Sequence, residues 1–144
     1  MAAHPGAGYS GTPLPRKLGI KDAHVVLLDR VPETVDLGDL GGAHVVRRLP
    51  SANTPQADVA VTFHTRQRTL EARLPLLVDR MPAAGMVWVC WPKRSAPPAI
   101  RLPSDLDENA VRDLALALGV IDVKVAAIDQ VWSGLKLVRR LRDR

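Results

Sequence analysis

Cysteine and aromatic residues are scarce in this sequence. Cysteine occurs once, at Cys90, so the chain cannot form an intramolecular disulfide, and this is typical of proteins from a reducing compartment. The four histidines are too far apart in sequence to pair as zinc ligands do, and none lies beside the cysteine. The composition therefore excludes a disulfide-rich scaffold, and we expect no metal site.

Long apolar segments are also missing. No apolar stretch approaches the roughly 18 residues that indicate a membrane-spanning helix. Residues 1–10 lack the basic segment and the apolar core of a secretory signal. We therefore expect a cytoplasmic protein that makes no contact with membranes.

The bulk composition is that of a globular protein. Hydrophobic residues account for 47% of the 144 positions and charged residues for 24%, which suits a folded core. We expect a single domain over residues 1–144, with a flexible N-terminal arm over 1–15 and an α/β core over 16–144. The net charge of +5 permits binding to nucleic acid or to an acidic partner, but it establishes neither.

The segment 85–93 is the longest apolar run without alternation. It reads Gly-Met-Val-Trp-Val-Cys-Trp-Pro-Lys, which indicates a strand covered on both faces, as central parallel strands are. Trp88 and Trp91 are three residues apart, so they should face opposite sides of the sheet and belong to the core. Cys90 is then a buried, inert thiol.

Outside this run, segments with the pattern of a strand alternate along the sequence with segments that have the pattern of a helix. Strands are expected over 25–28 and 57–63, a short edge strand over 43–49, helices over 65–81 and 105–118, and a terminal hairpin over 121–127 and 135–138. This order predicts an α/β, three-layer Rossmann-like fold, with a mostly parallel sheet that ends in an antiparallel C-terminal hairpin. Residues 30–56 show little periodicity.

Both helices carry boundary signals. Thr65 can cap the first helix, and Pro75 lies inside it, so we expect a kink or two short helices. Asp105 and Glu108 have the spacing of a capping box at the start of the second helix.

Ionisable residues follow four of the expected strands. Ligands of open α/β sheets bind beyond the carboxyl ends of the strands, so these positions are our candidates for ligand binding. The candidates are Asp29, His64, Lys93 and Asp129, with Trp132 and Ser133 in the hairpin turn beside Asp129. A histidine there could transfer protons and a lysine could receive an anionic ligand. Polar residues also follow strands simply because loops meet water, and we assign no catalytic residue.

Two features near the C-terminus leave alternatives open. Trp132 is either a lid over the sheet or a contact for a partner. The last strand and tail are basic, and the candidates for phosphate contacts are Lys136, Arg139, Arg140 and Arg142. The alternative, which we favour, is a frayed and solvated C-terminus. No aromatic residues interleave with these charges, so the sequence does not indicate a platform for single-stranded nucleic acid.

Four stretches resemble a small family of bacterial proteins, of actinobacterial type, that share a domain of unknown function. They read Gly8-Tyr9-Ser10-Gly11 with Lys17-Leu18-Gly19-Ile20, Val87-Trp88-Val89-Cys90-Trp91-Pro92-Lys93, Asp122-Val123-Lys124-Val125 and Trp132-Ser133-Gly134-Leu135-Lys136. The element order also resembles a reduced class I methyltransferase fold, in which a final reversed strand returns to the sheet. That second resemblance is one of topology.

One departure from the methyltransferases guides the expected function. Those enzymes have a glycine-rich turn after the first strand, which lets the backbone approach adenosylmethionine, whereas residues 29–33 contain no glycine. We therefore expect no cofactor. The main hypothesis is a non-catalytic or regulatory domain that acts through a protein partner or a small anionic ligand at the carboxyl ends of the strands. The alternatives are a degenerate methyltransferase-like enzyme using the same edge, or weak nucleic-acid binding through the tail.

Overall fold

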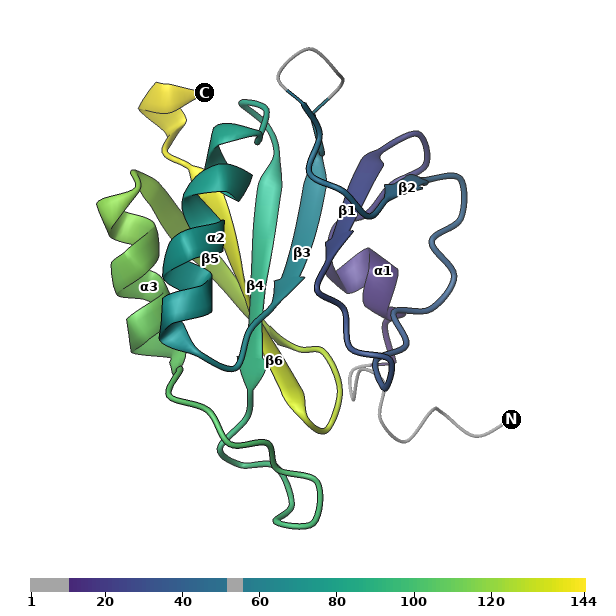
Figure 1. The fold of residues 1–144 in the computed structure, drawn as a ribbon. Helices are drawn as coiled ribbons and strands as arrows, with labels where there is room; N and C mark the ends of the chain where they lie inside the picture. Colours follow the sequence, from purple (N-terminus) through teal and green to yellow (C-terminus); the bar gives the residue numbers. More distant parts are fainter. Residues whose placement is uncertain (1–10, 52–55) are drawn as a thin grey trace.

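Six strands form one sheet in the order β2-β1-β3-β4-β6-β5 in a computed structural model that describes residues 11–51 and 56–144 (Figure 1). The strands are β1 Val25–Asp29, β2 His44–Val46, β3 Val59–Phe63, β4 Met86–Pro92, β5 Val120–Ala127 and β6 Trp132–Arg139. The helices are α1 Leu14–Lys17, α2 Gln67–Asp79 and α3 Glu108–Ala117, followed by the 3-10 turn η1 Leu141–Asp143. Strands β2, β1, β3 and β4 run parallel, and the β5–β6 hairpin pairs antiparallel with β4. The predicted fold class is confirmed.

Strand β4 has the predicted character of a strand covered on both faces. Every residue from Val87 to Pro92 is buried. Trp88 and Trp91 belong to the cores on opposite sides of the sheet, and the indole N–H of Trp88 donates to the carbonyl of Leu18, 2.9 Å away. Cys90 is fully buried, and burial raises the pKa of its thiol far above the ordinary value, so it stays protonated.

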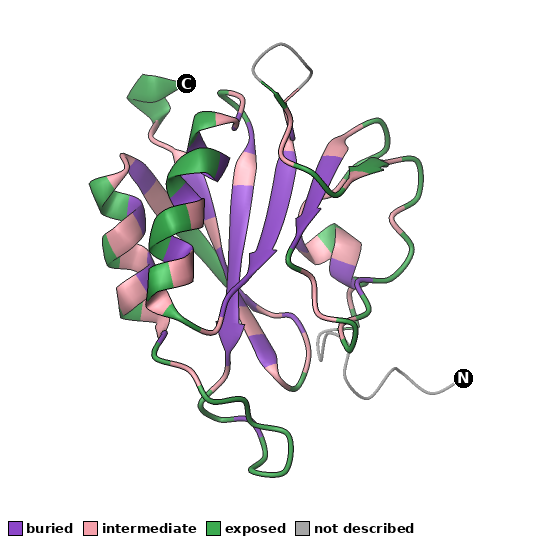
Figure 2. Ribbon diagram, viewed as in Figure 1, coloured by how far each residue is buried: buried purple, intermediate pink, exposed green. Residues whose placement is uncertain are grey.

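The two faces of the sheet carry two separate cores. On one face, α2 and α3 pack Leu70, Leu74 and Val111 against the strands. On the other face, α1 and the connection from β1 to β2 supply Leu18 and Leu37. Figure 2 shows that the strands between these layers are mostly buried while the outer helix faces are exposed. The chain is therefore a three-layer structure with its longer helices on one side only.

The helix boundaries differ from the prediction. Helix α2 runs through Pro75 as one element, and Thr65 does not cap it. Instead, the carboxylate of Asp105 accepts a hydrogen bond from the backbone N–H of Gln67, 2.7 Å away. Helix α3 is capped by Asp107, which accepts from the N–H of Ala110 at 2.8 Å, so the proposed capping box is wrong. Asp105 therefore caps α2 rather than α3.

The structure describes only part of the expected N-terminal arm. Residues 1–10, which hold most of the expected arm and the stretch Gly8-Tyr9-Ser10, lie outside the described residues. The described part of that arm contains Leu14, which is buried. Of the helices in the described residues, none has the length and apolar character needed to cross a bilayer.

Candidate functional site

The four predicted strand-end residues divide into two pairs. Along β3, Thr62 and His64 point to the α2 side of the sheet, where Asp29 at the end of β1 also lies. Lys93 follows β4, and its electrostatic neighbours are Asp129 and Lys17, which belongs to α1 on the other side. The structure therefore brings Asp29 to His64, and Lys93 to Asp129, without joining all four in one cluster.

Asp29 is a buried carboxylate with its oxygens occupied. The hydroxyl of Thr62 donates to Oδ2 at 2.7 Å, and Arg73 of α2 donates from Nη2 to Oδ1 at 2.8 Å and from Nε to Oδ2 at 3.2 Å. Burial alone would raise the pKa of Asp29, but the hydrogen bonds from Arg73 and Thr62 outweigh it and hold the pKa below its ordinary value. The carboxylate stays ionised, with Arg73 as its partner.

His64 continues this network away from Asp29. It is 1% exposed, its Nε2 lies 2.7 Å from the Thr62 hydroxyl, and its Nδ1 lies 2.9 Å from the Thr69 hydroxyl. Because Thr62 gives its only proton to Asp29, its oxygen accepts from Nε2–H. Nδ1 of the neutral ring is then an acceptor, and the single proton of the Thr69 hydroxyl is shared between Nδ1 and the carbonyl of Arg66, both 2.9 Å away. Burial, reinforced by the charge of Arg30, lowers the pKa of His64 to about 4, so the ring is neutral at pH 7.

This geometry assigns a positioning role to His64. Both ring nitrogens are bonded to threonine hydroxyls, and the side chain is closed off from solvent. A ligand at the sheet edge therefore cannot touch the ring. The chain of hydrogen bonds from Thr69 through His64 and Thr62 to Asp29 ties the start of α2 to the ends of β3 and β1.

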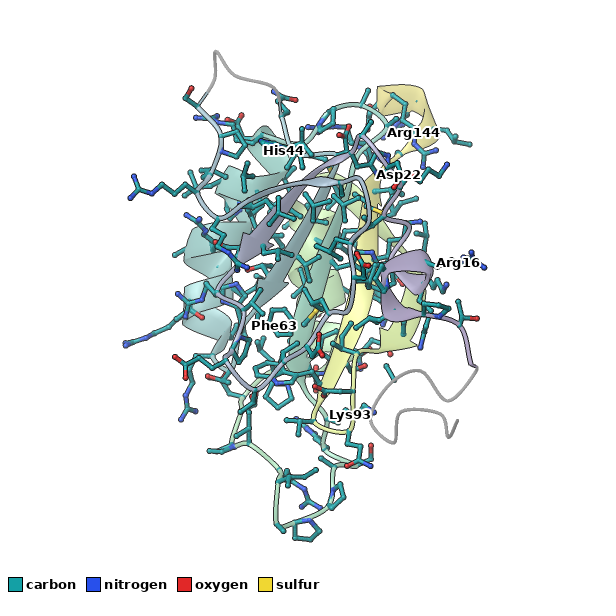
Figure 3. The ribbon with its side chains drawn as sticks, turned by 90° about the vertical axis from the view of Figure 1, so that its right-hand side faces the viewer. Arg16, Asp22, His44, Phe63, Lys93 and Arg144 are labelled. Carbon is teal, nitrogen blue, oxygen red and sulfur yellow. The ribbon has the colours of Figure 1, made fainter. Side chains whose placement is uncertain are left out.

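The second pair lies at the hairpin turn. Lys93 is half-buried, and burial lowers its pKa, an effect that nearby Asp129 opposes and Lys17 reinforces. Asp129 Oδ1 accepts from the N–H groups of Val131 and Trp132, both at 2.8 Å, and so holds the turn between β5 and β6. Figure 3 shows Lys93 at the end of the molecule where the parallel strands finish.

Trp132 is a lid over the sheet. Its side chain is 3% exposed, and its ring packs edge-on against Phe63 with 5.1 Å between the centroids. Ser133 is half-buried and lies opposite Trp91 in the ladder between β4 and β6. Of the two alternatives for Trp132, this burial favours the lid over the sheet.

The turn after β1 has an unusual backbone. Arg30 has φ of 59°, in the left-handed region that non-glycine residues rarely adopt. Its Nε donates to the carbonyl of Phe63 at 3.3 Å, so its side chain crosses from the end of β1 to the end of β3. The turn thus has the local conformation that glycine normally provides, with an arginine in the position.

The sequence analysis missed four residues of this site. Each contacts or neighbours Asp29 or His64, yet none was a candidate: Arg30, Thr62, Thr69 and Arg73. Thr62 shares the strand alternation of His64, and Arg73 follows Leu70 by three residues on the inward face of α2, so a signal for each existed. Nothing in the sequence marks Arg30 as left-handed.

The four basic residues near the C-terminus that were candidates for phosphate contacts do not form one patch. Arg139 donates from Nη2 to the carbonyls of Val78 and Met81, at 2.8 and 2.7 Å, and so serves the end of α2. Arg140 pairs with Asp143 at 2.9 Å, and Arg142 is exposed. Lys136 lies opposite Trp88 in the β4–β6 ladder, on the other face of the sheet from the α2 contact of Arg139.

No protein-family model and no curated protein sequence matches the chain. Solved structures share its fold. The 1,6-didemethyltoxoflavin-N1-methyltransferase of Burkholderia thailandensis, with S-adenosylhomocysteine bound, matches with a TM-score of 0.57 and 13% identity over 88% of this chain and 74% of that one. A SAM-dependent methyltransferase from Aquifex aeolicus matches with a TM-score of 0.55 and 13% identity over 85% of each chain. The LepI complex with SAM matches with a TM-score of 0.53 and 14% identity, over 88% of this chain and 39% of that one.

Other matches are longer proteins. The chain spans 52% of a magnesium protoporphyrin IX methyltransferase from Synechocystis PCC 6803 and 35% of an O-methyltransferase from neocarzinostatin biosynthesis. The Burkholderia and Aquifex structures show that this chain has a methyltransferase-like Rossmann fold.

These neighbours contradict two predictions. The sequence predicts a non-catalytic or regulatory domain without a cofactor, whereas the proteins with this fold include methyltransferases. The Burkholderia enzyme is solved with S-adenosylhomocysteine and LepI with SAM. The turn after β1 lacks the glycine, yet Arg30 adopts the left-handed φ that glycine normally provides.

Proposed function

We propose that the chain is an adenosylmethionine-dependent enzyme of the methyltransferase type, with the cofactor at the carboxyl ends of β1, β3 and β4. The left-handed turn at Arg30 carries this proposal, because it is the feature that lets backbone N–H groups approach a ligand beyond β1. The fold shared with the Burkholderia and Aquifex methyltransferases over most of this chain supports it.

The described residues fit adenosylmethionine at two places. The turn that begins at Arg30 would present its backbone to the nucleoside part. Lys93 and Asp129 form a half-buried pair of opposite charge, which suits the carboxylate and ammonium of the amino-acid part. When bound, adenosylmethionine would supply an electrophilic methyl group.

One position departs from the usual arrangement of nucleoside sites. An acidic residue following the second strand commonly accepts hydrogen bonds from a ribose, whereas Arg47 and Arg48 follow β2 here. Asp29 cannot replace it, because Arg73 and Thr62 occupy its oxygens. We therefore assign the ribose to main-chain contacts of the turn rather than to a carboxylate.

The buried network orients the cofactor site and takes no part in proton transfer to a substrate. His64 is neutral and sealed from solvent, and Asp29 is held as an ion by Arg73. Their effect is to fix the ends of β1 and β3, from which the turn at Arg30 and the loop at Thr65 emerge. Pre-organising such loops lowers the entropy that a ligand loses on binding.

The narrower family and partner assignments belong to this proposal. We assign the chain to the small bacterial family that shares its four quoted stretches, and we assign a small molecule as the methyl acceptor. The segment between β4 and α3 follows Lys93 directly and holds exposed Ile100 and Leu102, so it would face an acceptor.

Calorimetric titration with adenosylmethionine and S-adenosylhomocysteine tests the proposal. We expect both to bind, and we expect Lys93→Gln to weaken binding at least about tenfold, because a charge-assisted hydrogen bond is removed. Lys21→Gln removes the same charge at the opposite end of β1 and should change affinity less than about twofold. Absence of binding by the folded wild-type protein, or equal weakening by both variants, would refute the proposal.

A further inference from the structure

The face of the sheet opposite α2 and α3 is only half covered. On that side, Leu37 from the connection between β1 and β2 belongs to the core, and the carbonyl of Leu18 after α1 accepts from the indole N–H of Trp88 in β4. Helix α1 also reaches the end of β5, where Lys17 donates to the carbonyl of Ala127. Strand β5, at the edge, instead exposes Val123 to 50% and Lys124 to solvent. Figure 3 shows α1 on this side of the sheet, away from α2.

Three cations meet on this uncovered part. Lys136 of β6 lies directly opposite Lys124 of β5, so the two side chains share a face of the sheet. Arg144 is an electrostatic neighbour of Lys136 as well. Among the residues that the structure describes, none forms an ion pair with Lys124, Lys136 or Arg144.

The arrangement is electrostatically unfavourable as it stands. Burial lowers the pKa of the Lys136 ammonium, and the charges of Lys124 and Arg144 lower it further. Like charges placed directly across a strand pair destabilise a sheet. A bound anion would reverse the sign of this interaction, so the cluster gains stability from an anionic ligand.

A hollow lies beside the cluster. Its volume is about 280 Å³, at the lower end of the range for small-molecule sites. Apolar side chains of Ala84, Met86, Val123 and Val138 line it, together with Lys136 and Arg144. The lining of the hollow is thus mostly apolar, with two cationic side chains among it.

The distribution of basic side chains around the hollow favours a small ligand over a polymer. Arg139 and Arg140 are engaged by carbonyls and by Asp143, so no continuous basic stripe extends from the hollow along the tail. Arg144 donates its Nε to the carbonyl of Arg139 at 2.8 Å, which leaves its Nη groups to face a ligand. Figure 3 places Arg144 and Lys93 at opposite ends of the molecule. The hollow is therefore separate from the cofactor site proposed above.

We propose that this hollow binds a small phosphorylated molecule, with the phosphate held by Lys136 and Arg144 and the carbon skeleton packed on Met86, Val123 and Val138. Lysine acts as a point charge toward phosphate and arginine as a two-pronged donor, so the pair suits a phosphate monoester. The site does not depend on the proposed methyltransferase function.

Phenyl phosphate is the probe for this site, with phenol and inorganic phosphate as its two halves. In amide-resolved NMR titrations we expect phenyl phosphate to shift the signals of Met86, Val123, Lys136 and Val138, and to bind more tightly than either half. Lys136→Gln should weaken its binding at least about tenfold. This variant relieves a like-charge contact, so it should remain folded.

A matched variant and a second ligand make the test decisive. Arg68→Gln removes one positive charge from the exposed side of α2 and should change affinity less than about twofold. Shifts confined to Arg30, Thr65 and Lys93, equal weakening by both variants, or no binding of phenyl phosphate would overturn the proposal. Tighter, steeply salt-dependent binding of a short DNA duplex would also overturn it, in favour of a nucleic-acid surface.

Discussion

Arg73 of α2 holds the carboxylate of Asp29 at the end of β1 through two hydrogen bonds, of 2.8 and 3.2 Å. Asp29 is 5% exposed, so the carboxylate has exchanged water for this guanidinium and the hydroxyl of Thr62. A buried charge that loses its partner costs far more than an exposed ion pair contributes. The contact therefore fixes α2 over the edge of the sheet where the proposed ligand binds.

Replacing Arg73 by methionine should lower the free energy of unfolding by about 3 kcal/mol, because the aliphatic stem is retained while Asp29 is left buried and unpaired. Urea unfolding at pH 7 measures the change. Arg68→Met on the exposed side of the same helix is the control and should cost less than about 0.5 kcal/mol. Equal losses in the two variants would show that the pair with Asp29 contributes nothing specific.

The stability of the protein should fall as the solution becomes more acidic. His64 has a folded-state pKa of about 4, against 6.5 for a histidine in water, so the unfolded state binds more protons between these values. Its contribution, about 3 kcal/mol, is complete above pH 6.5 and is lost as the pH falls toward 4. Asp29 acts in the same direction at lower pH, because its folded pKa is also depressed.

Urea unfolding at several pH values between 7 and 4 measures this dependence. His64→Gln should flatten the slope in that window whatever it does to stability at pH 7. His44 is exposed on β2, and His44→Gln should keep the wild-type slope. A wild-type slope retained in His64→Gln would contradict the assignment.

The fold could be predicted from the sequence, whereas the site could be predicted only in part. Buried runs such as Val87 to Pro92 mark a strand by composition alone, and the helices follow from their apolar spacing. The positions of Asp29 and His64 at strand ends were also predicted. Their partners were not, because Thr62 and Arg73 acquire their roles only when α2 crosses β1 and β3.

The predicted helix caps were wrong for a related reason. A cap that lies within four residues of its helix leaves a local signal, but Asp105 reaches Gln67 across 38 positions of sequence. Lys93 pairs with Asp129 rather than with His64, and this depends on the face of the sheet toward which each loop runs. The sequence does not predict that face, because the alternation of side chains along a strand does not continue into a loop.

A side chain at Gly134 would be packed tightly against its neighbours in the core. A Cβ there would lie 3.1 Å from Cδ1 of Ile128 and 3.2 Å from Cε3 of Trp88. Trp88 is fully buried and is held by its bond to Leu18, so it cannot retreat. Gly134→Ala should therefore cost about 1–3 kcal/mol in urea unfolding. Ser133→Ala, the neighbouring half-buried position, should cost less, and the reverse order would contradict the packing argument.

Asp105 links the segment after β4 to the start of α2. Its carboxylate accepts from the N–H of Gln67, and its own N–H donates to the carbonyl of Thr65 at 3.3 Å. Asp105→Ala should remove about 1 kcal/mol of stability, the usual cost of a lost N-terminal cap. Hydrogen exchange should accelerate at the amide of Gln67 while amides in the middle of β4 stay protected. Asp113→Ala, on the exposed side of α3, is the matched control and should leave that amide unchanged. Unaltered exchange at Gln67 in Asp105→Ala would show that water or another group caps the helix, which would contradict the role of Asp105 as the cap.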